Sequence, residues 1–228
     1  MKPSSPPPRT PSRLSDSLHH QLNMYALAAS AAGVGVLALA QPAEAKIVYT
    51  PTHVVIGYGG VQSYQLDLNH DKVTDFTLSH TGSCSTTGCS YILRQWPDNE
   101  NAAVGHFSVW QFFDSALKWG ARIGPKANFL AHYAWLVRAR TTFSKGRTWV
   151  TGPWANVRNR YLGLRFQIKG KIHYGWARMT VKVNGADITA TLTGYAYETI
   201  PNKAIIAGKT KGPDGTPATL GRLALGRK

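Results

Sequence analysis

The sequence predicts an all-β protein, an antiparallel β-sandwich of jelly-roll-like type, and three observations support this class. First, long segments rich in β-branched and aromatic residues follow one another at 161–168, 172–183 and 188–199. Second, Asn184 and Gly185 lie between the last two of these segments, a pair typical of a tight hairpin turn. Third, shorter alternating segments precede them at 63–68, 75–79 and 91–96.

The first and last expected strands flank this pattern. Residues 46–56 are rich in β-formers, and Pro51 within them predicts a break or an edge position, because proline donates no ladder hydrogen bond. Glycine-containing turns are expected at 57–60 and 169–171. Residues 204–207 predict a short closing strand.

The middle of the chain, residues 97–160, has a weaker pattern. Residues 110–119 fit either a strand or a short helix. Between 128 and 140, apolar residues recur at the spacing of one helical face, at Phe129, Leu130, Tyr133, Leu136 and Val137. Residues 120–125 and 146–153 predict turns. We therefore expect a loop-rich or partly helical middle segment.

The N-terminal segment has the pattern of a signal peptide. Residues 24–40 form an apolar run, and Ala43-Glu44-Ala45 follows as a small-x-small cleavage site. The run is too short for a convincing membrane span, and a buried first helix would rarely end in such a site. We expect a signal peptide over 1–45, a β-sandwich domain over 46–208 and a flexible basic tail over 209–228. The mature chain would then be exported, extracellular or attached to the cell envelope, with no transmembrane span.

The chain is strongly basic, with 26 Lys and Arg against 11 Asp and Glu and a net charge of +15. Such a balance favours anionic partners, namely nucleic acid, acidic polysaccharide or an anionic envelope polymer. The cations are scattered rather than clustered in one block, which is typical of a dispersed positive surface. Nucleic acid is not expected, because no RNA-binding sheet signature accompanies the charge.

Two cysteines, Cys84 and Cys89, lie close together in a segment rich in Ser, Thr and Gly. In an exported protein an even, close pair predicts a disulfide. The alternative, a metal site, would lack neighbouring ligands at zinc spacing.

A polar segment resembles a short calcium loop. Oxygen-bearing side chains fall at alternate positions and a backbone carbonyl at the seventh, which gives the candidate ligands Asp67, Asn69, Asp71, Val73 and Asp75. Lys72 stands where such loops usually have glycine, and Leu78 where they have a bidentate glutamate. A structural Ca²⁺ site and a solvated acidic turn between two strands are therefore both open.

Tyr174 and Trp176 project from the same face of an expected strand. They would either stack on a bound sugar or fill the sandwich core, and large aromatics in central strands usually pack inward. No catalytic residue is expected: the chain lacks G-x-S-x-G and H-E-x-x-H. An Asp114–Glu198 pair is the remaining arrangement for a polysaccharide hydrolase.

Three segments together resemble exported bacterial proteins of unknown function of the PEP-CTERM-associated type. They are LDLNHDKVTDF at 66–76, YLGLRF with HYGWAR at 161–166 and 173–178, and TGYAYET at 193–199. The C-terminal segment 216–228 is similar to a degenerate PEP-CTERM sorting signal, and a disordered basic tail is the alternative. The resemblance implies a secreted β-sandwich without a known activity.

From these features we expect an exported, non-catalytic envelope or extracellular-matrix protein that binds an acidic polysaccharide or surface polymer. The alternative is a secreted hydrolase that acts on polysaccharide.

Overall fold

The computed structural model describes residues 46–108 and 110–212. The expected signal peptide and most of the expected tail therefore lie outside the described residues. No helix within the described ranges has both the length and the apolar character needed to cross a membrane.

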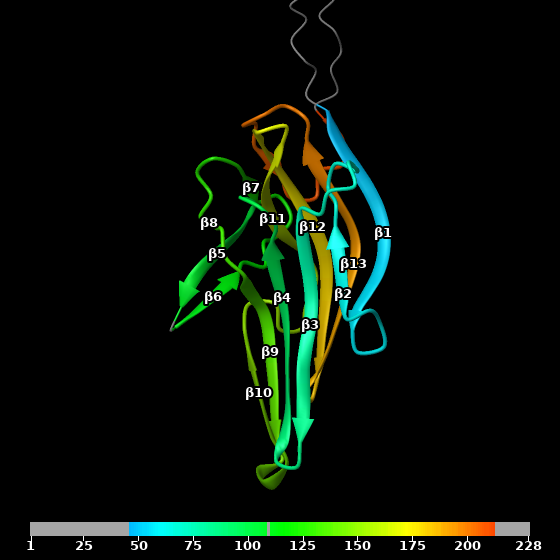
Figure 1. Ribbon diagram of the computed structural model, residues 1–228, viewed down its shortest axis with the longest axis vertical. Helices are drawn as coiled ribbons and strands as arrows, with labels where there is room; N and C mark the ends of the chain where they lie inside the picture. Colours follow the sequence, from blue (N-terminus) through cyan, green and yellow to red (C-terminus); the bar gives the residue numbers. More distant parts are fainter. Residues whose placement is uncertain (1–45, 109, 213–228) are drawn as a thin grey trace, which may run out of the picture. The chain divides into compact units, whose positions relative to one another are not determined.

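The described chain is almost entirely β structure, so the predicted all-β class is confirmed (Figure 1). The strands are β1 (Ile47–Gly57), β2 (Ser63–Leu66), β3 (Phe76–Ser85), β4 (Gly88–Pro97), β5 (Ala102–Ser108), β6 (Gln111–Asp114), β7 (Arg122–Ile123), β8 (Phe129–Leu130), β9 (Ala134–Thr142), β10 (Arg147–Thr151), β11 (Val157–Ile168), β12 (Lys171–Asn184), β13 (Asp187–Glu198) and β14 (Ile205–Ile206). One 3₁₀ turn, Phe143–Lys145, connects β9 to β10.

Twelve strands form one sheet, in the order β1-β13-β12-β11-β5-β6-β9-β4-β3-β2, with β10 beside β9 and β8 beside β5. The two end strands, β1 and β2, are joined by the turn at 57–60, where the Val61 N–H donates to the Val55 carbonyl. The sheet therefore curves round until it is nearly barrel-shaped. Pro51 lies in the end strand β1 at a register shift, as the edge alternative predicted.

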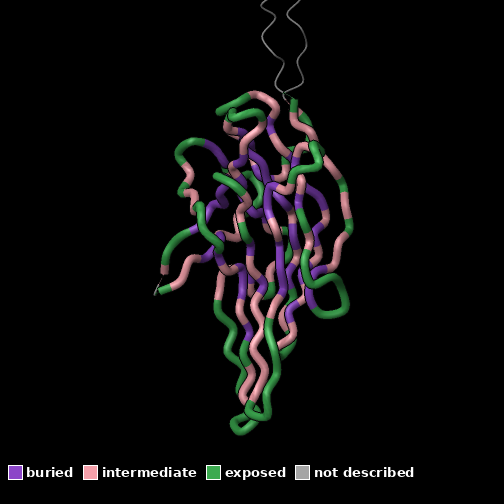
Figure 2. Tube along the Cα trace, viewed as in Figure 1, coloured by how far each residue is buried: buried purple, intermediate pink, exposed green. Residues whose placement is uncertain are grey.

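One main core lies between the two halves of this sheet. Its buried side chains include Met179 and Leu192 from the β11–β13 half and Leu78, Leu93 and Val137 from the β3–β4–β9 half. Figure 2 shows the buried stretches in the centre, whereas the far ends of the β3–β4 and β9–β10 hairpins are exposed. Each hairpin therefore begins at the core and ends in solvent.

A second apolar cluster covers the other face of β12. Tyr174 and Trp176 meet Tyr161 there, together with Ile123 and Ile205 from the small β7–β14 sheet. The alternate residues Ala177 and Met179 face the main core. Strand β12 is therefore buried on both faces.

The predicted hairpins occur where expected, with one change of turn. Lys169 and Gly170 both have positive φ, 50° and 73°, as a type I′ turn requires. In the next hairpin Asn184 pairs with Asp187, so the two loop residues are Gly185 and Ala186. Gly185 alone has positive φ among these two, which is typical of a type II′ turn with glycine first.

The predicted helical face over 128–140 is wrong, because these residues form β8 and β9. In β9 a register shift places Leu93 opposite Val137 and Arg94 opposite Trp135, so Leu136 is an extra residue. Leu136 and Val137 are both fully buried as a result. Two consecutive inward residues at a bulge imitate the spacing of a helix. Residues 147–151, expected as a turn, form β10.

Candidate functional site: a basic face on four strands

Four neighbouring strands, β3, β4, β9 and β10, present one polar face to solvent. Residues that pair directly across antiparallel strands project to the same side, so Ser83, Ser90, Arg140 and Trp149 form one row across the sheet. The adjacent rows add further hydroxyl groups and cations. We call this surface the basic face; its outward residues are Thr81, Ser83, Ser85, Ser90, Ile92, Arg94, Trp96, Trp135, Arg138, Arg140, Thr142, Arg147, Trp149 and Thr151.

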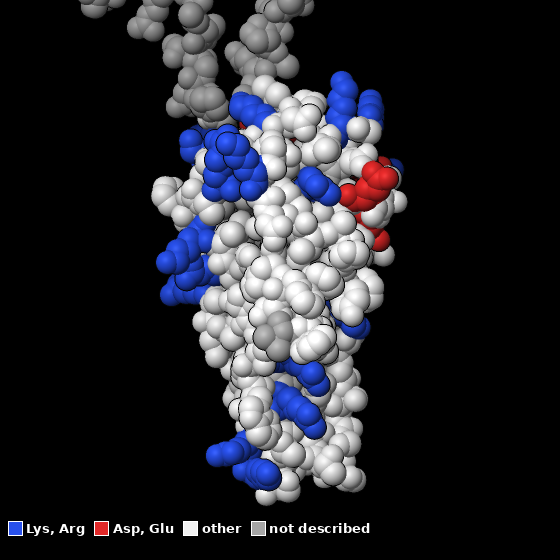
Figure 3. Space-filling model, turned by 90° about the vertical axis from the view of Figure 1, so that its left-hand side faces the viewer, with Lys and Arg blue, Asp and Glu red and all other residues white. Residues whose placement is uncertain are grey.

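The basic face carries positive charge without acidic residues. Strands β3, β4, β9 and β10 contain no Asp or Glu, whereas Arg94, Arg138, Arg140 and Arg147 lie on them and Lys145 lies in the turn between β9 and β10. Within the described residues the one ion pair, Lys203 with Glu198, lies elsewhere. Figure 3 shows Lys and Arg over the upper part of the view and also along its lower part, whereas Asp and Glu lie mainly at one upper edge. Among residues 46–108 and 110–212, the cations of the basic face therefore form no ion pair with a carboxylate.

Two adjoining hollows lie along the basic face. One, of about 310 Å³, lies between the β3–β4 hairpin and β9, and its walls include Ser83, Ser90 and Arg138. The other, of about 430 Å³, is lined by Arg138, Arg140, Thr142, Lys145, Trp149 and Thr151. The Arg138 Nε donates to Ser90 Oγ at 3.2 Å, and its guanidinium lies 5.3 Å from the centre of the Trp135 ring. Arg138 and Arg140 line both hollows.

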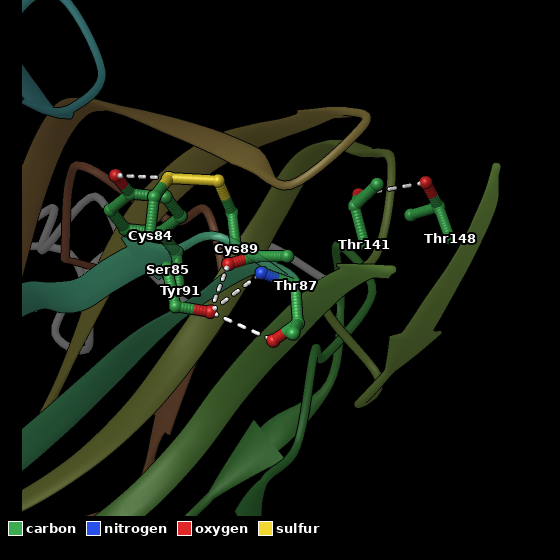
Figure 4. The surroundings of a disulfide bond; sticks show 8 residues. Cys84, Ser85, Thr87, Cys89, Tyr91, Thr141 and Thr148 are labelled. Atoms are coloured by element: carbon green, nitrogen blue, oxygen red, sulfur yellow. Dashed lines mark hydrogen bonds between the residues drawn. A yellow bond between two sulfur atoms is a disulfide. The ribbon is translucent and has the colours of Figure 1, made fainter. Parts of the chain in front are cut away.

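The predicted disulfide joins Cys84 to Cys89 across the β3–β4 hairpin, with their Cα atoms 4.0 Å apart (Figure 4). Because successive residues of a strand alternate in direction, the two sulfurs project away from the basic face. Tyr91 Oη lies 3.5 Å from Cys84 Sγ on that reverse side. Ser85 Oγ accepts the Thr87 N–H at 3.2 Å and so holds the turn. The disulfide therefore cross-links the end of the hairpin on the side away from the basic face and leaves the basic face itself accessible.

The candidate calcium loop is a compact acidic turn between β2 and β3. The Asp67 carboxylate accepts backbone N–H groups from His70 and Lys72 at 2.7 and 2.8 Å. Lys72 adopts φ of 71°, the left-handed conformation that favours glycine at this position. Asp71 accepts the Val73 N–H at 2.8 Å and the Asn69 side-chain amide at 2.8 Å.

Asp75 is the most perturbed acid of this loop. It is only 5% exposed, and its pKa is raised to about 6, mainly by burial and to a smaller extent by the negative charges of Asp67 and Asp71. The Leu68 N–H and the Asn101 amide oppose this change by donating to its carboxylate.

The loop fits a cation only in part. Asn69 Oδ1 is a buried acceptor without a hydrogen-bond partner, and the three acids are close enough to raise one pKa. Among residues 46–108 and 110–212, however, no three His, Cys, Asp or Glu side chains gather as metal ligands. The loop therefore has the charge for a cation, whereas its carboxylates are directed at backbone N–H groups.

Tyr174 and Trp176, the predicted stacking pair, are 3% and 0% exposed. Trp176 packs edge-on against Tyr161 at 5.2 Å, and its Nε1–H donates to the Lys209 carbonyl at 3.3 Å. The stacking alternative is therefore wrong, since burial against the second cluster leaves neither ring open to a ligand. The core alternative accounts for both residues.

The geometry does not support Asp114 and Glu198 as a hydrolytic pair. Asp114 is fully buried, neither carboxylate oxygen has a hydrogen-bond partner, and burial raises its pKa well above the ordinary value. Glu198 is 2% exposed and forms an ion pair with Lys203 at 3.3 Å. A glycosidase needs both carboxyl groups on an open cleft, and neither of these reaches one.

Sequence reasoning did not identify Arg138, Arg140 and Trp149 as parts of one site. The two arginines are two residues apart, which places them on one face of a strand but on different faces of a helix. The helical interpretation of 128–140 therefore concealed them. Ser90 is 48 positions from its partner Arg138, a distance along the chain that no local pattern bridges.

No family model, curated protein or solved structure matches the chain.

Proposed function

We propose that this protein is an exported, non-catalytic envelope or matrix protein that binds an acidic polysaccharide on its basic face. The observation that carries the proposal is the set of cations on β4, β9 and β10, which have no acidic neighbour on their strands. Export rests on the N-terminal segment and on the resemblance to PEP-CTERM-associated proteins. Of these two, the N-terminal segment lies outside the described residues, whereas the three segments that carry the resemblance lie within them.

The chemistry of the basic face suits a polymer with carboxylate or sulfate groups. Arginine forms planar, two-point hydrogen bonds with such groups and is held here close to Ser90 and Trp135. Serine and threonine hydroxyls supply donors and acceptors for sugar hydroxyls. Trp149 is 47% exposed and pairs across the strands with Arg140, so a sugar ring can lie on it beside a cation.

The test is the binding of a polyuronate to the mature chain, with the double variant Arg138→Gln/Arg140→Gln. Loss of two charge-assisted hydrogen bonds should weaken binding at low salt by roughly tenfold or more. The matched control, Lys169→Gln/Lys171→Gln, removes two exposed charges from the β11–β12 turn and should change affinity less than about twofold. Equal losses in both variants would point to diffuse attraction, and salt-insensitive binding would contradict the proposal.

Calcium binding by the loop at 67–75 remains a prediction, and its expected role is structural. If Asp67, Asn69, Asp71, Asp75 and the Val73 carbonyl hold Ca²⁺, the native state should gain stability by mass action. Thermal melts with millimolar calcium and with a chelator should then differ by several degrees. Asp71→Asn should remove that difference, whereas identical melts of the unmodified chain would exclude a site in this concentration range.

A further inference from the structure

We propose that a hollow at the end of β4 farthest from the Cys84–Cys89 turn binds a sugar ring. The basic face then continues into an aromatic subsite, and the ligand is a polyuronate rather than any polyanion. The proposal rests on the proposed function and specifies its ligand. The hollow has a volume of about 400 Å³, and its walls include Trp96, Trp110, Phe112, His132 and Tyr133.

The aromatic rings of this hollow are open to solvent. Trp96 and Tyr133 are 41% and 42% exposed, with ring centres 4.7 Å apart and planes tilted by 31°. Trp110 is 91% exposed, and Phe112 lies beside His132 at 5.4 Å. Exposed aromatics held side by side are unusual on a surface without a partner. A sugar ring offers a C–H face to such rings and hydroxyl groups to the Gln111 amide and the imidazole.

The hollow lies on the same face as the cations. Ser90, Ile92, Arg94 and Trp96 alternate along β4 and therefore project to one side. At about 3.4 Å per residue, the strand from Gly88 to Trp96 spans roughly 27 Å. This length suits a chain of several sugars and exceeds what a single small ligand needs.

Arginine and tryptophan recur as neighbours along this track. The Arg94 guanidinium lies 5.3 Å from the centre of the Trp96 ring, and Arg138 lies 5.3 Å from that of Trp135. Arg140 pairs across the strands with Trp149. A uronate unit combines a ring that can stack with a carboxylate that can pair, and each Arg–Trp neighbour pair offers both contacts. A polyanion without sugar rings would pair with the arginines but could not stack on the tryptophans.

The experiment compares oligouronate with polyglutamate, a carboxylate polymer without sugar rings, by isothermal titration at fixed salt. We expect oligouronate to bind at least about tenfold more tightly per carboxylate. Trp96→Ala/Tyr133→Ala should remove that advantage, because it should lower the affinity for oligouronate far more than the affinity for polyglutamate. Trp96→Phe keeps a ring and should retain most of the affinity, which separates stacking from a fault in folding. Trp119→Ala, which removes another exposed tryptophan (73%), should have no effect.

The outcomes separate the two proposals. If neither polymer binds, the proposed function fails. If both bind equally and Trp96→Ala/Tyr133→Ala changes nothing, the aromatic subsite fails while the basic face stands. Loss of binding to anionic lipid vesicles in that variant, with oligouronate binding intact, would assign the rings to a membrane surface and overturn the inference.

Discussion

The two halves of the sheet use similar strands for opposite purposes. In the β11–β13 half, β12 is covered on both faces, by the main core on one side and by the β7–β14 cluster on the other. In the other half, β3, β4 and β9 bury one face against the core and direct the other, with its cations, outward, and β10 beside them is exposed throughout. A strand covered on both faces can only support the fold, whereas a strand covered on one face has its other face free for recognition.

Replacing one tryptophan in each half of the sheet is the strongest test of this contrast. Trp176→Ala removes a fully buried ring from β12 and should destabilise the protein by about 3–5 kcal/mol. Trp149→Ala, at a half-exposed position on β10, should cost less than about 1 kcal/mol. Chemical denaturation measures both values. Equal losses would mean that the outer strands contribute as much to the core as β12 does.

The disulfide is the next largest effect and concerns the exposed half. Cys84→Ser/Cys89→Ser should lower the free energy of unfolding by roughly 2 kcal/mol, the value expected for such a short closed loop. Reduction of the disulfide in the unmodified chain should lower the free energy of unfolding by the same amount. The same reducing agent should not change the stability of the variant. A variant as stable as the oxidised parent would show that strand pairing alone holds the hairpin.

Because Asp75 is buried, the free energy of unfolding should depend on pH. Unfolded Asp75 ionises near 3.8, whereas in the folded chain burial raises its pKa to about 6. The folded carboxyl therefore retains its proton between these values, so stability should fall from about pH 4 to pH 6 and stay lower above. After allowance for solvent screening this loss is roughly 1–2 kcal/mol. Asp75→Asn should flatten this part of the stability curve, and an unchanged curve would contradict the assignment.

The smallest effect is expected at the end of the β5–β6 hairpin. Trp110 is 91% exposed, so Trp110→Ala should change the free energy of unfolding by less than about 0.5 kcal/mol. Thermal melts of the variant and the parent should therefore nearly coincide. A large loss would mean that this ring is part of the fold rather than part of a binding surface.

The same contrast explains what could be predicted from sequence. The three long strands were identifiable because β12, covered on both faces, and its neighbours β11 and β13 carry almost continuous apolar and aromatic residues with turn glycines between them. The disulfide was predictable because Cys84 and Cys89 are close in sequence. Strand β9 was not, because the bulge at Leu136 gives it helical spacing. The basic face was not predictable either, since it appears only when β4 and β10 are placed on either side of β9.

The two ends of the described chain, at residues 46 and 212, determine how the basic face would be oriented if the protein were attached to a surface. The Thr199 N–H donates to the Lys46 carbonyl, and in Figure 1 both ends of the described chain lie at the end of the molecule opposite the turn between β3 and β4. Any attachment made through either end would therefore leave the hairpin end of the basic face pointing away from the anchor. Tension between an anchor and a captured polymer would run lengthwise along β4 and β9, the direction in which many ladder hydrogen bonds share the load at once.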